Sequence, residues 1–87
     1  MVSQKITVKN ASGLHARPAS ELAKVCSQCK SDIAIVVGEK RINPKSILIL
    51  MSAAIRCGTE ILVECTGDSE KEDLEAVINA IDGGLGE

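Results

Sequence analysis

The chain has 87 residues, 45% of them hydrophobic, so we expect one globular domain, residues 1–87, with a core of modest size. Lys and Arg (ten) are interspersed with Asp and Glu (twelve) and aromatic residues are absent, so direct nucleic-acid binding lacks both a basic block and stacking side chains. No apolar run is longer than that of residues 47–51, which cannot span a bilayer. Residues 1–5 lack a signal-peptide core, so we expect a cytoplasmic protein without membrane insertion.

Residues 2–8 predict a first strand, because apolar and polar residues alternate along them, and residues 10–13 interrupt it. A helix is predicted from Ala16. Its apolar residues follow the helical spacing: Ala19, Leu22, Ala23 and Cys26. Pro18 fits the first turn of this helix, where its missing N–H has no helical acceptor, so the helix begins beside His15.

Three more strands are expected. Residues 32–37 form an apolar, β-branched run, and Gly38-Glu39 predicts a two-residue hairpin turn of the Gly-first kind. Residues 40–43 return as the next strand, which Pro44 ends. Residues 60–65 predict the last strand, with one apolar face made of Ile61, Val63 and Cys65.

Ser46 predicts the N-cap of a short helix over residues 47–51. This helix is apolar on every side, and Ser52 is its first polar residue. A small domain cannot bury all of it, so we expect part of it to face a partner protein. The alternative is an unusually apolar core helix.

Residues 69–72, Ser-Glu-Lys-Glu, predict a capping box at the start of the last helix, and Gly83-Gly84 predicts its end. Its apolar stripe is Leu74, Val77, Ile78 and Ile81. The element order β-α-β-β-α-β-α predicts an α+β domain in which helices cover one face of an antiparallel sheet.

The four cysteines raise the question of a zinc or redox site. Cys26 and Cys29 have ligand spacing, but Cys57 and Cys65 do not. The Cys26–Cys29 pair also closes a helix rather than opening one, where the dipole would lower a thiol pKa. We therefore expect free, largely buried thiols, no metal and no cofactor. A zinc or redox module is the alternative, which metal analysis and thiol titration would distinguish.

The strongest functional signal is His15, the only histidine, at the threshold of the first helix in the segment Gly-Leu-His-Ala-Arg-Pro-Ala, residues 13–19. A neutral imidazole nitrogen can attack an electrophile. The backbone N–H groups of Ala16 and Arg17 and the helix dipole favour a bound dianion, and the Arg17 guanidinium can clamp phosphate oxygens. These features predict a phosphoryl acceptor. The alternative is a histidine that merely precedes a helix.

Four segments together resemble the HPr family, the histidine-containing phosphocarriers of the bacterial sugar phosphotransferase system. They are residues 13–20, residues 44–48 with Met51, residues 58–65 and residues 67–70. The resemblance implies an open-faced β-sandwich, a four-stranded antiparallel sheet in the order 1-4-2-3 with three helices on one face. It also implies that His15 accepts a phosphoryl group from phosphorylated Enzyme I and passes it to IIA domains of sugar transporters, with Arg17 as the stabilising cation.

The same resemblance implies a regulatory role for Ser46, as the serine that an ATP-dependent HPr kinase/phosphorylase modifies in the Gram-positive branch. Ile47, Leu48 and Met51 match the family's hydrophobic docking patch. We therefore expect a monomeric phosphoryl relay without turnover of its own. The alternative is a signalling module whose Ser46-phosphorylated form acts as corepressor of a catabolite-control transcription regulator. The related paralogue that lacks the active histidine is disfavoured, because His15 is present.

Overall fold

The computed structural model of the chain describes residues 1–85. Its elements are β1 (Val2–Thr7), α1 (Ala16–Gln28), β2 (Asp32–Val37), β3 (Lys40–Ile42), α2 (Ile47–Ser52), β4 (Glu60–Thr66) and α3 (Glu70–Asp82). Their order is the predicted one, β-α-β-β-α-β-α.

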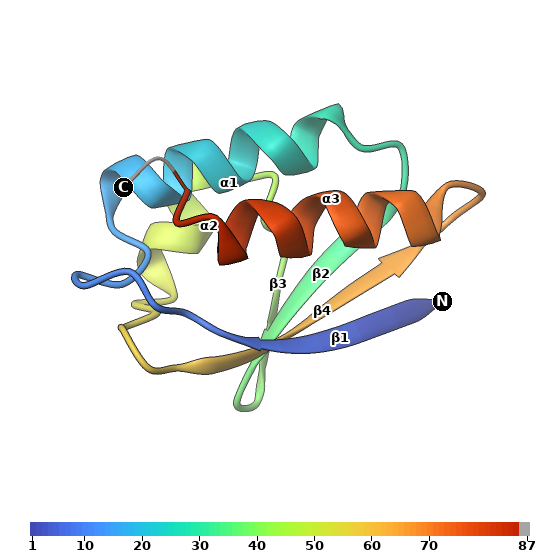
Figure 1. The fold of residues 1–87 in the computed structure, drawn as a ribbon. Coiled ribbons are helices and arrows are strands. Elements are labelled where there is room, and N and C mark those ends of the chain that lie inside the picture. The colour runs from blue at the N-terminus through green and yellow to red at the C-terminus, as the bar shows by residue number, and fades with distance from the viewer. Residues whose placement is uncertain (86–87) are drawn as a thin grey trace.

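The four strands form one antiparallel sheet in the order β1-β4-β2-β3. The two central strands, β4 and β2, are far apart in sequence and pair directly, with Val63 opposite Ile35. All three helices lie on one face of the sheet, and the other face is open (Figure 1). The predicted α+β fold, an open-faced β-sandwich with sheet order 1-4-2-3 and three helices on one face, is therefore confirmed.

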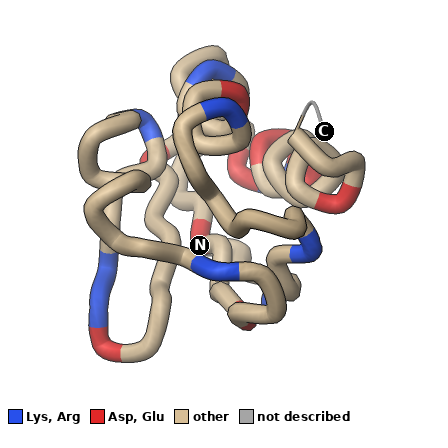
Figure 2. Tube along the Cα trace, turned by 90° about the vertical axis from the view of Figure 1, so that its left-hand side faces the viewer, with Lys and Arg blue, Asp and Glu red and all other residues tan. Residues whose placement is uncertain are grey.

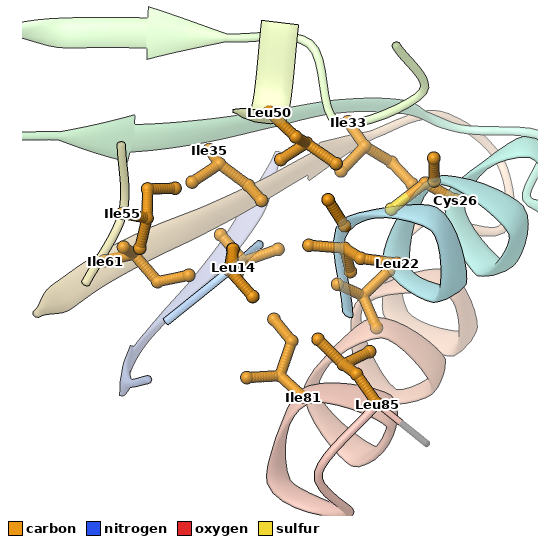
Figure 3. Packing of buried hydrophobic residues seen from close by; sticks show 14 of the residues in the cluster. Leu14, Leu22, Cys26, Ile33, Ile35, Leu50, Ile55, Ile61, Ile81 and Leu85 are labelled. Carbon is orange, nitrogen blue, oxygen red and sulfur yellow. The ribbon is translucent and has the colours of Figure 1, made fainter. Parts of the chain in front are cut away.

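The core lies between the sheet and the helices. Strand β4 alternates as predicted: Ile61, Val63 and Cys65 are buried beneath the helices, while Leu62 and Glu64 are half-buried on the open face. The helices and connecting segments contribute Leu14, Ala19, Leu22, Ala23, Cys26, Leu50, Ile55, Val77, Ile81 and Leu85. Figure 3 shows aliphatic side chains from the sheet and from the helices converging on this layer.

The hairpin between β2 and β3 has the predicted turn. Val37 pairs with Lys40, which leaves Gly38 and Glu39 as the two turn residues. Gly38 has a φ of 59°, whereas Glu39 does not adopt a positive φ. A positive φ at the first position alone is the requirement of a type II′ turn, and glycine meets it without steric cost.

The predicted capping box at the last helix is wrong. Ser69 is the N-cap of α3, but its backbone is not extended (ψ 25°) and its side chain makes no capping hydrogen bond. Its hydroxyl donates instead to the Asp73 carboxylate, at 2.8 Å. The Ser31 hydroxyl and backbone N–H donate to the same carboxylate. Asp73 therefore ties the start of β2 to the first turn of α3, a contact between segments that a local motif does not reveal.

These hydrogen bonds also set the charge state of Asp73. The Ser31 hydroxyl contributes most, and with Ser69 it outweighs the opposing effect of partial burial, so the pKa of Asp73 is lowered from its usual value. The carboxylate is thus held ionised as an acceptor of hydrogen bonds.

Charged side chains are mixed over the surface. Figure 2 shows Lys and Arg on several separate segments, with Asp and Glu among them. Within residues 1–85, none of the helices combines the length and the hydrophobicity that crossing a membrane requires.

Candidate functional site

His15 is the N-cap residue of α1 and is exposed. Its backbone is extended (φ −78°, ψ −168°), and its carbonyl accepts the first hydrogen bond of the helix from the Ala19 N–H, at 2.9 Å. Its imidazole makes no capping hydrogen bond to the helix. The side chain is therefore presented at the surface, at the positive end of a thirteen-residue helix.

The residue before the histidine is an anchor. Leu14 is buried, with 3% of its surface exposed, and its N–H donates to the Ile55 carbonyl at 2.8 Å. Figure 3 shows the Leu14 side chain in the middle of the core, between Ile55 and Ile61 on one side and Leu22 on the other. Because this neighbour is held by packing and by a hydrogen bond, the backbone of His15 has little freedom to move.

Gly13 makes this anchoring possible. Its φ is 70°, and a Cβ atom at this position would lie 2.2 Å from the Ile55 carbonyl oxygen and 2.7 Å from the Arg56 Cα. Any side chain at residue 13 would therefore push the segment after α2 away from the histidine loop. The glycine allows the two backbones to touch.

The first turn of α1 offers two backbone donors. Pro18 has no N–H, and the Ala19 N–H is already bonded to His15. The N–H groups of Ala16 and Arg17 are those without an acceptor inside the helix. Both N–H groups follow the histidine directly, and their use as donors to a phosphoryl group stays a prediction.

The site is electropositive. Arg17 is exposed, and the first turn of α1 contains no acidic residue. Within residues 1–85, no carboxylate lies at salt-bridge distance from the Arg17 guanidinium. No carboxylate of the described residues neutralises its charge, which is therefore available for an anion bound at the helix terminus.

The second predicted functional segment is α2. Ser46 is its N-cap and is half-buried, and its hydroxyl accepts a hydrogen bond from the Ile49 N–H at 3.3 Å. Leu50 is fully buried and joins the core. The other apolar side chains are exposed: Ile47 by 42%, Leu48 by 78%, Ile49 by 43% and Met51 by 45%. The expectation that the domain does not bury all of this helix is confirmed, and the expectation that the exposed part faces a partner protein stays a prediction.

One exposed residue was missed by the sequence reasoning. Ile49 is as exposed as Ile47 and Met51, and it lines a groove of about 270 Å³ between α2 and β3 together with Ile42 and Leu48. A helix that is apolar all round gives no sign of which side faces the core, so the sequence does not show that Ile49 is exposed.

Helix α2 packs against α1, and in Figure 1 it lies beside the N-terminal part of α1, at the end of the molecule that carries His15.

The cysteines are free thiols in three environments. Cys26 and Cys65 are buried, which raises the pKa of Cys26 to about 12 and that of Cys65 to about 11, and Cys29 is half-buried. Cys57 is exposed, so the prediction of largely buried thiols is wrong there, because Cys57 lies in a turn before β4 rather than on the apolar face of an element. Among residues 1–85, no three His, Cys, Asp or Glu side chains are placed to hold a metal ion.

Residues 2–82 match the PTS-HPr family, described as the phosphorylation site of the HPr component of the phosphotransferase system. The chain belongs to the HPr family.

The phosphocarrier protein HPr of Neisseria meningitidis is 38% identical over 87 residues, which cover all of this chain and 98% of the relative. HPr-C-His from Thermoanaerobacter tengcongensis has a crystal structure that matches with a TM-score of 0.94 at 34% identity, covering 100% of this chain and 98% of that one. Crh of Bacillus subtilis, described as a catabolite repression HPr, is 40% identical over 75 residues (86% of this chain, 88% of Crh), and its solution structure has a TM-score of 0.66. Family membership agrees with the resemblance found in the sequence, and the relatives include both phosphocarriers and a catabolite-repression protein.

Proposed function

We propose that this protein is a cytoplasmic phosphoryl relay in which His15 accepts a phosphoryl group from phosphorylated Enzyme I and passes it to IIA domains of sugar transporters. The observation that carries the proposal is the exposed imidazole at the start of α1, followed by the Ala16 and Arg17 N–H groups and an arginine without a carboxylate partner among residues 1–85.

The chemistry of the relay is a double displacement at phosphorus. A neutral ring nitrogen of His15 attacks the phosphorus of the donor phosphohistidine, the donor N–P bond breaks, and Enzyme I leaves with a neutral imidazole. The acceptor IIA domain then repeats the step on phosphorylated His15. Developing charge on the phosphoryl oxygens is stabilised by the helix N–H groups and by Arg17. Because the site is open on the surface, donor and acceptor approach it by the same route.

The direct test is incubation of the protein with Enzyme I and phosphoenolpyruvate, followed by intact mass measurement. We expect a mass increase of one phosphoryl group, labile in acid and stable in base, as for phosphohistidine. His15→Ala should abolish the increase without unfolding the protein, because this exposed side chain contributes little to packing. Ser46→Ala is the matched control and should still be labelled. Acid-labile labelling of His15→Ala at the wild-type level would exclude His15 as the acceptor.

A second function is supported by α2. Ser46 caps a helix whose exposed apolar residues Ile47, Leu48 and Met51 form a surface suited to partner proteins, and Crh is a relative of this chain. We propose that HPr kinase/phosphorylase modifies Ser46 and that the modified protein then binds a catabolite-control transcription regulator as corepressor. A pull-down with purified regulator tests this. The regulator should retain the Ser46-phosphorylated protein even when that protein also carries His15→Ala, and it should not retain the unmodified protein.

A further inference from the structure

The segment between α2 and β4 is bound firmly to the loop that carries His15. The Leu14 N–H donates to the Ile55 carbonyl at 2.8 Å. At the other end, Val8 makes two further bonds to the segment: its N–H donates to the Thr59 carbonyl at 2.9 Å, and its carbonyl accepts from the Gly58 N–H at 2.7 Å. Figure 1 shows these two segments side by side at one end of the molecule. The turn formed by residues 56–59 is thus attached on both sides.

Arg56 stands at the start of this turn, next to the histidine loop. Its Cα would be 2.7 Å from a Cβ atom on Gly13, so the two backbones are in contact. His15 follows Gly13 by two residues, which is at most about 7 Å of chain. An extended arginine side chain covers a comparable distance, so the Arg56 guanidinium can reach a group carried by the imidazole. The turn keeps the Arg56 backbone fixed, since its carbonyl accepts a hydrogen bond from the Thr59 N–H at 3.1 Å.

The charge of Arg56 is not used elsewhere in the described part of the chain. Its side chain is exposed, and within residues 1–85 no carboxylate lies at salt-bridge distance from it. Nearby Lys9 is different, because its ammonium pairs with Asp82 at 3.7 Å. Arg41, on β3, is paired with Glu64. Arg56 therefore lies beside the histidine loop, and the N–H donors of its guanidinium are available to an added anion.

We infer that Arg56 is a second phosphoryl-binding residue, which contacts the phosphoryl oxygens on His15 from the segment between α2 and β4, whereas Arg17 contacts them from α1. This inference rests on the proposed function of His15. A phosphoryl dianion has three terminal oxygens, and two backbone N–H groups with one guanidinium do not use all their acceptor positions. A second guanidinium from a separate rigid segment adds charge-assisted hydrogen bonds that the helix terminus cannot supply.

The test begins without any partner protein. Wild-type protein, Arg56→Ala, Arg56→Lys and Arg41→Ala are phosphorylated chemically with phosphoramidate, and the second ionisation of the phosphoryl group is followed by phosphorus NMR as a function of pH. Arg41→Ala is the matched control, since it removes the same charge from a site on the sheet. Circular dichroism checks that each variant is folded.

We expect Arg56→Ala to raise the pKa of the phosphoryl group by about half a unit, because a neighbouring cation favours the dianion. Arg56→Lys should keep most of the wild-type value, and Arg41→Ala should equal wild type. An unchanged titration in Arg56→Ala would overturn the inference, and so would an equal shift in Arg41→Ala, which would indicate a long-range effect of net charge.

Kinetics with Enzyme I separate this inference from the proposed function. We expect Arg56→Ala to lower kcat/KM for phosphorylation about three- to tenfold, as for a partly solvent-screened contact. A higher KM with an unchanged phosphoryl titration would assign Arg56 to Enzyme I docking and overturn the inference. If His15 of the wild-type protein accepts a phosphoryl group from phosphoramidate but not from phosphorylated Enzyme I, the proposed function fails. The comparison of phosphoryl titrations by NMR still decides the role of Arg56. If neither phosphoramidate nor phosphorylated Enzyme I modifies His15, both fail.

Discussion

Gly13→Ala is the substitution that tests most directly how the fold positions the histidine. The added methyl group meets two penalties in the structure. The alanine must adopt a φ of 70°, and its Cβ atom would lie 2.2 Å from the Ile55 carbonyl oxygen, far inside van der Waals contact. The atoms nearest to the added methyl group, the Ile55 carbonyl oxygen and the Arg56 Cα, belong to the backbone and cannot rotate away as a side chain can. The segment at Ile55 and Arg56 must therefore move.

The two penalties have separate sizes. Placing alanine in the left-handed region costs about 1–2 kcal/mol. Moving the Ile55 carbonyl also weakens its hydrogen bond with Leu14, which contributes about 0.5–1.5 kcal/mol. We expect Gly13→Ala to lower the free energy of unfolding by about 1.5–3.5 kcal/mol, the sum of the two penalties. For a domain of this size each kcal/mol corresponds to about 4–8 °C in Tm.

Urea unfolding followed by circular dichroism is the suitable assay, because the chain has no Trp or Tyr to report by fluorescence. Gly38→Ala is the control: Gly38 also has a positive φ (59°), but no atom lies within 4 Å of the added Cβ. It should show only the conformational penalty, about 1–2 kcal/mol. If Gly13→Ala destabilises the protein no more than Gly38→Ala, the contact with the Ile55 carbonyl does not carry the expected penalty. The displaced loop should also slow phosphorylation of His15, a change that Gly38→Ala should not produce.

Four further predictions follow from the site and its surroundings. Arg17→Ala should slow phosphoryl transfer about 10–150-fold if the contact is fully felt in the transition state, and Arg17→Lys should rescue it partly, as measured by stopped-flow or quench kinetics with Enzyme I. Ser46→Asp should weaken Enzyme I binding while leaving Tm unchanged or slightly raised, because the new charge lies at the N-terminus of α2 and beside Leu48; unchanged KM and rate would exclude this regulation. A thiol reagent at pH 8 should label Cys57 first and Cys29 more slowly, and should reach Cys26 and Cys65 only on unfolding, because burial raises the pKa of these two thiols to about 12 and 11; fast labelling of four thiols would contradict the packing. The pKa of Asp73 is lowered by Ser31 and Ser69, so its contribution is present above the ordinary Asp pKa of about 4 and is lost as the pH falls below it; urea midpoints of Asp73→Asn should therefore depend less on pH in this acid range than those of wild type.

Much of the secondary structure can be predicted from short-range signals. The hairpin is an example, because Gly38 and the Pro44 that follows the returning strand act on backbone dihedrals within a few residues. The start of α1 is another, since Pro18 is compatible with only the first turn of a helix. The capping box at Ser69 shows the limit of such reasoning. The local motif was present, but Asp73 offered the Ser69 hydroxyl an acceptor that also binds Ser31, forty-two residues away.

The candidate functional site also has features that the sequence predicts and features that depend on the tertiary structure. The amino-acid order alone places Ala16 and Arg17 directly after His15 and sets Ser46 before an apolar helix, because these relations are local. Which apolar residues of α2 remain exposed depends on how that helix rolls onto α1 and the sheet, and the burial of Leu50 decides it. The approach of Arg56 to the histidine loop depends on the contact between Leu14 and Ile55, which are far apart in the sequence, and this contact exists only because Gly13 leaves room for the Ile55 carbonyl. The relations between residues that are neighbours in the chain can therefore be predicted from the sequence. The contacts between distant segments depend on packing, which only the tertiary structure decides.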